Sequence, residues 1–212
     1  ATAQFGAQFI ETRVEAAITS HTLLDILAAE ADGYDAAIVS AFGDPGLAAA
    51  REMLDIPVVG LSEAALHTSY TLGRRIVIIC LTPRHRDWYG ESAEAAGLRD
   101  RIVNLRVLPV AVRNISTVVE DLADPLCKEC KRAVEEDRAE VVILGGGPTA
   151  GLTRRISDQV PVPLLDDVSF AVQMAESLAR LPIEPPRRGG FSRPDPKPTK
   201  GRSPALATYF EG

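Results

Sequence analysis

Two glycine-rich turns carry the residue types that could bind and activate a small molecule. One is Ala41-Phe42-Gly43-Asp44 and the other is Gly145-Gly146-Gly147-Pro148-Thr149, and each lies between an apolar run and a helical pattern. Glycine lets a ligand approach the backbone closely, and the N–H groups that open a helix attract anions and carbonyl oxygens. We therefore predict a site for a small carbonyl or carboxylate compound. Its predicted binding residues are Ala41, Phe42, Gly43, Asp44, Gly145, Gly146, Gly147 and Thr149, with Thr82 at the end of a third apolar run.

Carboxylates are the side chains near these turns best suited to move a proton. Asp44 lies in the first turn, where it could shuttle a proton or activate water, or instead cap the helix that follows. Asp166 and Asp167 follow another apolar run and present the same choice between capping a helix and serving the site. Asp44 is therefore the candidate catalytic residue.

Cysteines offer a weaker case for chemistry. Cys80, Cys127 and Cys130 make an odd count, which argues against a disulfide framework and for a reducing compartment. Cys127 and Cys130 form a C-x-x-C, but no second Cys or His pair completes a zinc set, and Asp124 reads as the cap of a helix that contains them. Cys80 reads as a buried thiol. We predict no metal site and, because the phosphate-loop and dinucleotide-binding patterns are absent, no cofactor.

The apolar runs predict the elements that must position these residues. Runs at 36–41, 57–59, 75–81, 103–108, 140–145 and 162–165 are mostly apolar and rich in β-branched residues, as strands buried on both faces are. Longer helical patterns separate them, including one around residues 23–27 with Ser20 or Thr22 as its expected cap. The alternation predicts an α/β fold with mostly parallel sheets and helices on both faces.

An internal repeat at an offset of about 105 residues predicts two similar lobes. Ala37–Leu47 overlays Val142–Leu152, Ile56–Val59 overlays Val162–Leu165, and Thr71–Arg74 overlays Ser177–Arg180. The expected domains are a first lobe at 1–74, with 168–181 as a candidate completion of it, a second lobe at 75–167, and a tail at 182–212. The repeat places the first-lobe counterpart of strand 75–81 before residue 1, so we expect that strand to be missing. The two turns should face each other.

Charge and composition limit the partners. The chain has 212 residues and a formal net charge of −6, which disfavours nucleic acid and anionic membranes, and no apolar run is long enough to span a bilayer. We expect a cytoplasmic protein. Seven of the 15 prolines fall in residues 182–212, which predicts a flexible, basic, Pro-rich tail. Its apolar run Ala205–Phe210 could instead dock on another subunit.

Three segments together resemble the hydantoin and allantoin racemase branch of the aspartate/glutamate racemase superfamily. They are Asp35–Glu52, with the run Ala41-Phe42-Gly43-Asp44-Pro45-Gly46-Leu47, then Pro57–Ala65, and Ile143–Leu152. The resemblance covers roughly residues 5–181. It implies two similar α/β domains with a site between them, association into homo-oligomers, and a racemase that needs no cofactor.

The resemblance also implies a mechanism that this chain does not match. In that family one cysteine removes the proton beside a carbonyl and a second cysteine returns one from the opposite face. These positions fall on Ala41 and Gly146, whose side chains cannot move a proton. We therefore expect a racemase or epimerase without the two-thiol mechanism. A hydrolase or decarboxylase-type lyase on the same scaffold, and a non-catalytic small-molecule-binding derivative, are the alternatives.

Overall fold

The computed structural model describes residues 10–110, 118–182, 184 and 186–211, and the chain divides into two compact units. The first unit comprises Ala1–Val39, Pro45–Val59 and Met174–Gly212, and the second comprises Ser40–Asp44 and Gly60–Gln173. All the predicted site residues therefore belong to the second unit.

A four-stranded parallel sheet forms the centre of the second unit. Its strands are β3 (Ile76–Cys80), β4 (Ile102–Val107), β5 (Val141–Leu144) and β6 (Leu164–Asp166), in the spatial order β4-β3-β5-β6. Every neighbouring pair is parallel. Because parallel strands need crossover connections, a helix follows each strand, and the predicted α/β class is confirmed.

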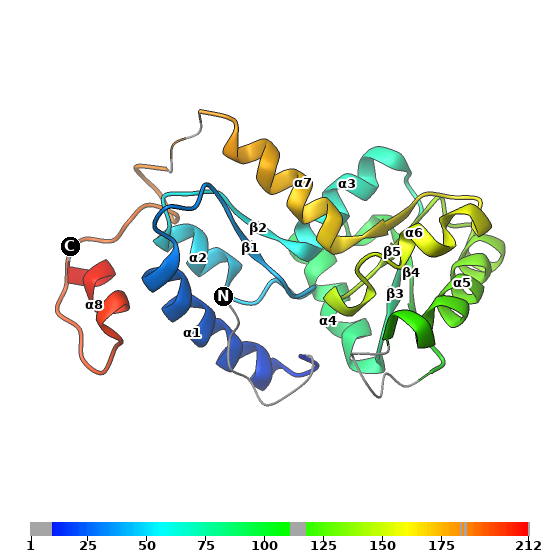
Figure 1. Ribbon diagram of the computed structural model, residues 1–212, viewed down its shortest axis with the longest axis horizontal. Coiled ribbons are helices and arrows are strands. Elements are labelled where there is room, and N and C mark those ends of the chain that lie inside the picture. The colour runs from blue at the N-terminus through cyan, green and yellow to red at the C-terminus, as the bar shows by residue number, and fades with distance from the viewer. Residues whose placement is uncertain (1–9, 111–117, 183, 185, 212) are drawn as a thin grey trace. The chain divides into compact units, whose positions relative to one another are not determined.

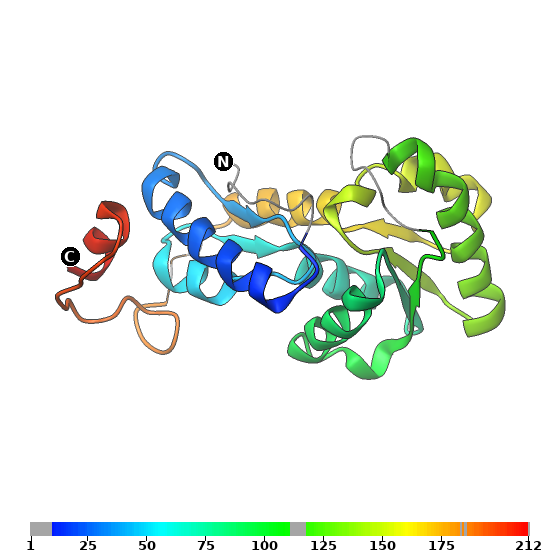
Figure 2. The ribbon, with the colours of Figure 1, turned by 90° about the horizontal axis from the view of Figure 1, so that it is seen from below.

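Helices cover both faces of this sheet. Alternate residues of β3 point to opposite sides, so Ile76 and Ile78 pack in one hydrophobic cluster while Val77 and Ile79 pack in the other. The first cluster includes residues of α3 (Leu61–Leu72) and α4 (Pro83–Ala95), and the second includes residues of α5 (Val118–Asp137) and the segment of α6 (Thr153–Ile156). Figures 1 and 2 show α4 and α5 on opposite sides of the strands. The short 3-10 helices are η1 (Arg99–Arg101), η3 (Gly147–Thr149) and η4 (Ser157–Gln159).

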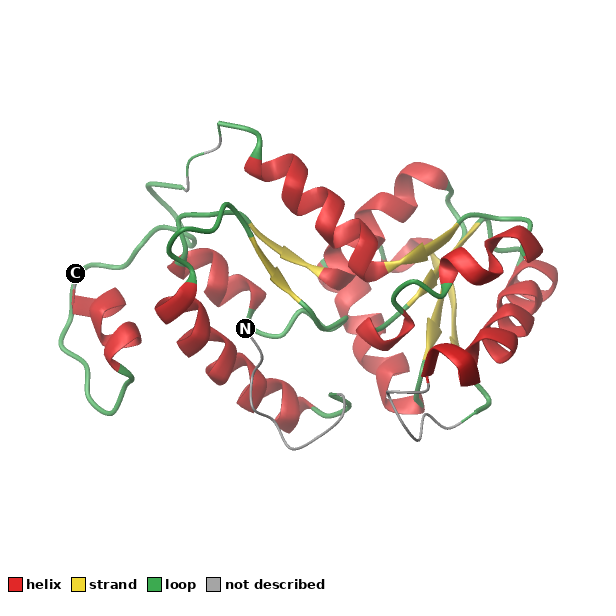
Figure 3. Cartoon of the chain, viewed as in Figure 1, coloured by secondary structure: helices red, strands yellow, loops and turns green. Residues whose placement is uncertain are grey.

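The first unit is built on a smaller sheet. Its strands are β1 (Ala37–Val39) and β2 (Val58–Gly60), joined by α2 (Leu47–Met53), and α1 (Arg13–Glu30) packs partly buried leucines against their core. Figure 3 shows these helices beside the two strands. α7 (Asp167–Ala179) begins in the second unit and ends in the first. No counterpart of β3 occurs in this sheet among the described residues.

Two helices begin earlier than predicted. α1 begins at Arg13, where Thr12 and Glu15 form a reciprocal capping box, and the predicted caps Ser20 and Thr22 lie inside the helix. Both hydroxyls donate to carbonyls four residues earlier instead. α5 begins at Val118 rather than after Asp124, and Pro125 lies within it.

The C-terminal segment contacts its own unit. α8 (Pro204–Glu211) packs against α1, with Leu206 buried, and the Ser203 hydroxyl donates to Asp25 at 2.6 Å. The Tyr209 hydroxyl lies 3.3 Å from the backbone oxygen of Glu52. α8 is therefore a helix docked on its own chain, which the expectation of a flexible tail did not include.

The two halves of the chain share an order of elements. β1, α2, β2 and α3 follow one another as β5, α6, β6 and α7 do, in agreement with the internal repeat. The compact units group residues 60–74 with β3 to β6, whereas the sequence analysis placed them in the first lobe. Leu66 of α3 explains this grouping because it packs in the same cluster as Ile76 and Ile78. The lobe boundaries at 74 and 167 stay a prediction.

Candidate functional site

The first predicted turn is organised by Asp44. Its backbone N–H donates to the Ala41 carbonyl at 2.9 Å, and its φ of 46° lies in the left-handed region. Its carboxylate accepts the backbone N–H groups of Ser62 and Glu63, each at 3.0 Å, and the Ser62 hydroxyl. Asp44 therefore caps α3, not the helix that follows it in sequence. Gly46, with a φ of 77°, occupies the N-cap of α2.

Burial makes the Asp44 carboxyl a weaker acid than an exposed aspartate. Desolvation raises the pKa of Asp44 above its ordinary value, although the hydrogen bonds from Ser62 and Glu63 oppose this effect. A Cβ atom at Gly60 would lie 2.3 Å from the Asp44 Cγ, so only glycine at position 60 leaves room for this contact. The candidate catalytic residue thus also joins the first turn to α3.

Removing the Asp44 carboxylate should weaken the fold measurably. In Asp44→Ala the two N–H groups that open α3 lose their acceptor, so we expect the free energy of unfolding to fall by about 1–2 kcal/mol. Urea unfolding measures this loss. Asp158→Ala, at an exposed site, is the control for removing a carboxylate, and an equal effect of both substitutions would contradict the capping role.

The second turn follows β5 and is held by backbone and hydroxyl contacts. Gly145 donates its N–H to Ile79 at 3.0 Å, and Gly146 has φ 112° and ψ 134°, a conformation available to glycine but strained for other residues. The buried Thr149 donates its N–H to the Gly146 carbonyl at 2.8 Å, and its hydroxyl lies 2.8 Å from that oxygen and 3.1 Å from the Leu144 oxygen. The Thr149 hydroxyl thus closes the turn.

Asp167 supplies a carboxylate to this second turn. Its Oδ2 accepts the Gly146 N–H at 2.8 Å and its Oδ1 accepts the Val168 N–H at 2.9 Å. The side chain is fully buried, and burial raises the pKa of Asp167 to about 7. Asp166, one residue earlier, caps α7 by accepting the Ser169 N–H at 2.8 Å, which confirms that part of the capping prediction.

Aromatic side chains of α4 meet both turns. A Cβ atom at Gly43 would lie 2.0 Å from the Trp88 ring, and one at Gly145 would lie 2.8 Å from the Tyr89 ring. The Phe42 and Tyr89 ring centroids are 4.4 Å apart. α4 therefore brings the two predicted turns together within one unit. The space that a Cβ atom would take at Gly43 and Gly145 is filled by these rings, so packing alone accounts for glycine at both positions, and ligand binding by the backbone of the turns stays a prediction.

The remaining predicted residues lie close to this cluster. Gly147 adjoins the segment of the first turn, because a Cβ atom there would lie 4.0 Å from the Ser40 hydroxyl. Thr82 is the N-cap of α4, where its hydroxyl accepts the His85 N–H at 3.4 Å. His85 stacks on Tyr89 with centroids 5.0 Å apart. Thr82 thus positions the helix that carries the aromatic side chains.

None of the three thiols lies in either turn, although Cys80 on β3 packs in the same cluster as Phe42 and Tyr89. Cys80, Cys127 and Cys130 are all free and buried, and burial raises the pKa values of Cys80 and Cys130 to about 12. The thiolate is the reactive form of cysteine, so these groups are poor bases at neutral pH. Among the described residues no group of three or more His, Cys, Asp or Glu side chains could hold a metal ion.

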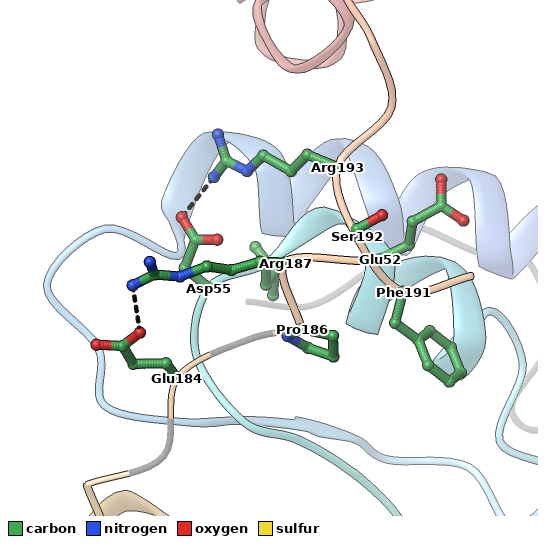
Figure 4. Close-up of a pocket in the computed structure, with 9 residues that line it drawn as sticks. Glu52, Asp55, Glu184, Pro186, Arg187, Phe191, Ser192 and Arg193 are labelled. Atoms are coloured by element: carbon green, nitrogen blue, oxygen red, sulfur yellow. Dashed lines mark hydrogen bonds and ion pairs between the residues drawn. The ribbon is translucent and has the colours of Figure 1, made fainter. Parts of the chain in front are cut away.

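A separate cavity of about 460 Å³ lies within the first unit. Its walls come from α2 and the following loop and from the chain beyond residue 183 (Figure 4). Two ion pairs line it, Arg193 with Asp55 and Arg187 with Glu184, each at 2.6 Å. It contains none of the predicted site residues, and each arginine is already neutralised by a carboxylate.

Comparison with known proteins shows the family to which the chain belongs. The sequence profile of the Asp/Glu/hydantoin racemase family matches residues 1–175. The chain belongs to this family. A hydantoin racemase of Paenarthrobacter aurescens is 33% identical over 184 residues, which cover 86% of this chain and 78% of the relative. A hydantoin racemase of Pseudomonas sp. (strain NS671) is 32% identical, covering 82% of this chain and 70% of the relative.

Solved structures agree with this membership of the Asp/Glu/hydantoin racemase family. The crystal structure of allantoin racemase from Pseudomonas fluorescens superposes with a TM-score of 0.86 at 30% identity, over 95% of this chain and 86% of that one. An arylmalonate decarboxylase shares the fold, with a TM-score of 0.62 at 16% identity. These relatives support a racemase-like function on small compounds. Within the described residues, no helix has the length and hydropathy of a membrane-spanning segment.

Sequence reasoning missed two side chains of this cluster and left the role of a third open. Trp88 and Tyr89 lie in a segment of α4 that is polar on average, so hydropathy gave no sign that they face the turns. Asp167 was predicted either to cap a helix or to serve the site, and its contact with Gly146 joins residues 21 apart. A signal existed in the repeat, because in both halves a carboxylate links the turn to the helix after the next strand.

Proposed function

We propose that this protein is a racemase or epimerase of a small carbonyl or carboxylate compound, such as a hydantoin or an amino-acid derivative, and that it works without the two-thiol mechanism. The observation that carries the proposal is that both turns of a racemase-family protein contact α4 while neither turn contains a cysteine, since Cys80 lies on β3 and Cys127 and Cys130 lie on α5. The family membership and the hydantoin racemases among its relatives support the substrate class.

The proposed site binds its ligand through the two turns. Backbone N–H groups of the turns would hold the oxygen on which negative charge develops, which is commonly the largest single contribution to such catalysis. The proposed binding residues are Ala41, Phe42, Gly43, Asp44, Thr82, Gly145, Gly146, Gly147 and Thr149, and Asp44 is the proposed proton carrier of the first turn. Burial raises the pKa of Asp44 above its ordinary value, and this supports the role because a carboxyl of raised pKa is a stronger base once it is ionised. No cofactor enters this mechanism, and we propose a homo-oligomer.

A screen in deuterated water tests the activity. The protein is incubated with each enantiomer of 5-substituted hydantoins, with allantoin and with aspartate-like acids, and deuterium at the α-carbon is followed by NMR together with ammonia and carbon dioxide. We expect deuterium incorporation with interconversion of the enantiomers. Release of ammonia or carbon dioxide would replace the proposal with a hydrolase or a decarboxylase-type lyase, and no reaction with any compound would overturn it in favour of a binding protein.

A further inference from the structure

Asp167 is a buried carboxyl to which the described residues bring no basic side chain. None of its surface is exposed, and its carboxylate accepts the N–H groups of Gly146 and Val168. Burying a carboxylate without a cation is costly, and such groups cluster where a protein needs a carboxyl of unusual acidity. Asp166 already caps α7, so helix capping alone does not require a second acidic residue at this place.

The surroundings of Asp167 form the second turn. A side chain at Gly146 would point toward Tyr89, because its Cβ atom would lie 3.4 Å from the Tyr89 hydroxyl oxygen. The charge of Asp167 is among the causes that raise the pKa of Tyr89, after burial and Cys80, so the two groups lie in electrostatic reach of each other. A carboxyl and a phenol thus stand at the position where the family resemblance implies one thiol.

We propose that Asp167 is the proton-transferring residue of the second turn, and that the Tyr89 hydroxyl donates a hydrogen bond to the substrate oxygen beside it. This inference rests on the proposed function and deepens it, because it replaces the thiol implied at Gly146 by a named acid and base.

The proposed step is balanced without any further reactant. The Asp167 carboxylate accepts the α-proton of the substrate, so the C–H bond breaks and an O–H bond forms on Asp167. The electron pair moves into the neighbouring carbonyl, whose oxygen becomes an enolate stabilised by hydrogen-bond donors. The reverse step returns a proton to the same face. A proton delivered from the first turn to the opposite face inverts the configuration.

Substrate binding would itself activate the carboxylate. The Gly146 N–H that now holds Asp167 Oδ2 at 2.8 Å is a predicted donor to the substrate oxygen. A substrate that takes this donor removes a hydrogen bond that stabilises the ionised carboxyl, and this loss makes Asp167 more basic. The same contact thus keeps the base in place when the site is empty and releases it when the substrate binds.

The acidities of the cluster suit these roles. Burial raises the pKa of Asp167 to about 7, with the charge of Asp166 on β6 adding to the effect and backbone hydrogen bonds opposing it. From α4 the cluster contains Tyr89 with the His85 ring stacked on it, and from β3 it contains Cys80. Burial raises the pKa of Tyr89 well above its ordinary value, so its hydroxyl stays protonated and able to donate.

Enantiomer-resolved exchange tests the inference. Deuterium uptake from each pure hydantoin enantiomer is measured between pH 5 and 9 for the unchanged protein, Asp167→Asn, Tyr89→Phe and the exposed-site control Asp158→Asn. For the unchanged protein we expect exchange to rise through a pH near 7. Asp167→Asn should exchange one enantiomer about 10²–10⁴-fold more slowly than the unchanged protein does. The rate that remains should no longer rise through a pH near 7. Asp158→Asn should behave as the unchanged protein does.

Each result separates this inference from the proposed function. If the unchanged protein exchanges none of the hydantoins, allantoin or the aspartate-like acids, the proposed function fails and the inference fails with it. If the unchanged protein does exchange, and folded Asp167→Asn exchanges each enantiomer as fast as the unchanged protein does, the inference on Asp167 fails alone. Should Asp167→Asn not fold, the pH profile of the unchanged protein decides, because a rate that stays constant from pH 5.5 to 8.5 overturns the inference. Tyr89→Phe should slow exchange while keeping its pH dependence, and an unchanged rate would refute the role of its hydroxyl.

Discussion

Arg106→Met is expected to lower the free energy of unfolding by about 3–5 kcal/mol, the cost of leaving a buried charge without its partner. Arg106 lies on β4 with 8% of its side chain exposed, and its guanidinium contacts Glu129 at 2.8 Å, Glu136 at 2.7 Å and Asp137. Glu129 is itself buried, so the substitution would leave its carboxylate with the exposed Arg132 as its one remaining cation among the residues that the structure describes. Urea unfolding monitored by circular dichroism measures the loss.

Arg132→Met is the matched control for this substitution. Arg132 contacts the same two glutamates, at 3.0 Å and 2.9 Å, but 53% of its side chain is exposed. Solvent screens exposed ion pairs, so we expect a much smaller loss of stability than for Arg106→Met. Equal losses for the two arginine substitutions would show that the buried network does not hold α5 to the sheet as the contacts indicate.

Asp167 should make the protein less stable as the pH rises from about 4 to 7. In the unfolded chain an aspartate loses its proton near pH 3.8, whereas the native Asp167 keeps it until about pH 7. Between these values the native state binds more protons than the unfolded state, so stability falls as pH rises. A pKa difference of this size corresponds to a loss of about 4 kcal/mol in the free energy of unfolding, and the loss is complete above pH 7.

The comparison that reveals this effect is the difference in unfolding free energy between the unchanged protein and Asp167→Asn. Asparagine does not titrate, so the variant should gain stability relative to the unchanged protein as pH rises from 4 to 8. Loss of one acceptor for the Gly146 or Val168 N–H adds a constant offset, which the pH series separates from the titration. A difference that is flat over this range would contradict the raised pKa of Asp167. Asp158→Asn is the control for the same chemical change at an exposed site.

Most of the sheet architecture could be predicted from the sequence because buried parallel strands leave a local signal. Each of the six apolar runs overlaps one of the strands β1 to β6, within a few residues at each end. The repeat also gave the order of elements that both halves share. Helix starts were less predictable, since Thr12 and Glu15 form a complete capping box while the favoured Ser20 lies in the helix interior.

The meaning of the glycines depended on tertiary contacts that the sequence does not display. A glycine after a strand predicts close approach of something to the backbone, and such an approach does occur at Gly43 and Gly145. The approaching groups are Trp88 and Tyr89, which belong to a helix of mostly polar residues. The partner of Asp44 was misassigned for a similar reason, because its carboxylate reaches Ser62 across 18 residues of sequence.

Proton exchange by a thiol-free protein is the measurement that tests the account most directly. Cys80, Cys127 and Cys130 are replaced together by alanine, the folded state is verified by circular dichroism and urea unfolding, and deuterium uptake by both hydantoin enantiomers is compared with that of the unchanged protein. If carboxyl groups move the proton, the folded variant should exchange within about threefold of the unchanged rate, far less than the loss of 10²-fold or more typical of a missing acid or base. Exchange that disappears from the folded, thiol-free protein would contradict a mechanism without cysteine.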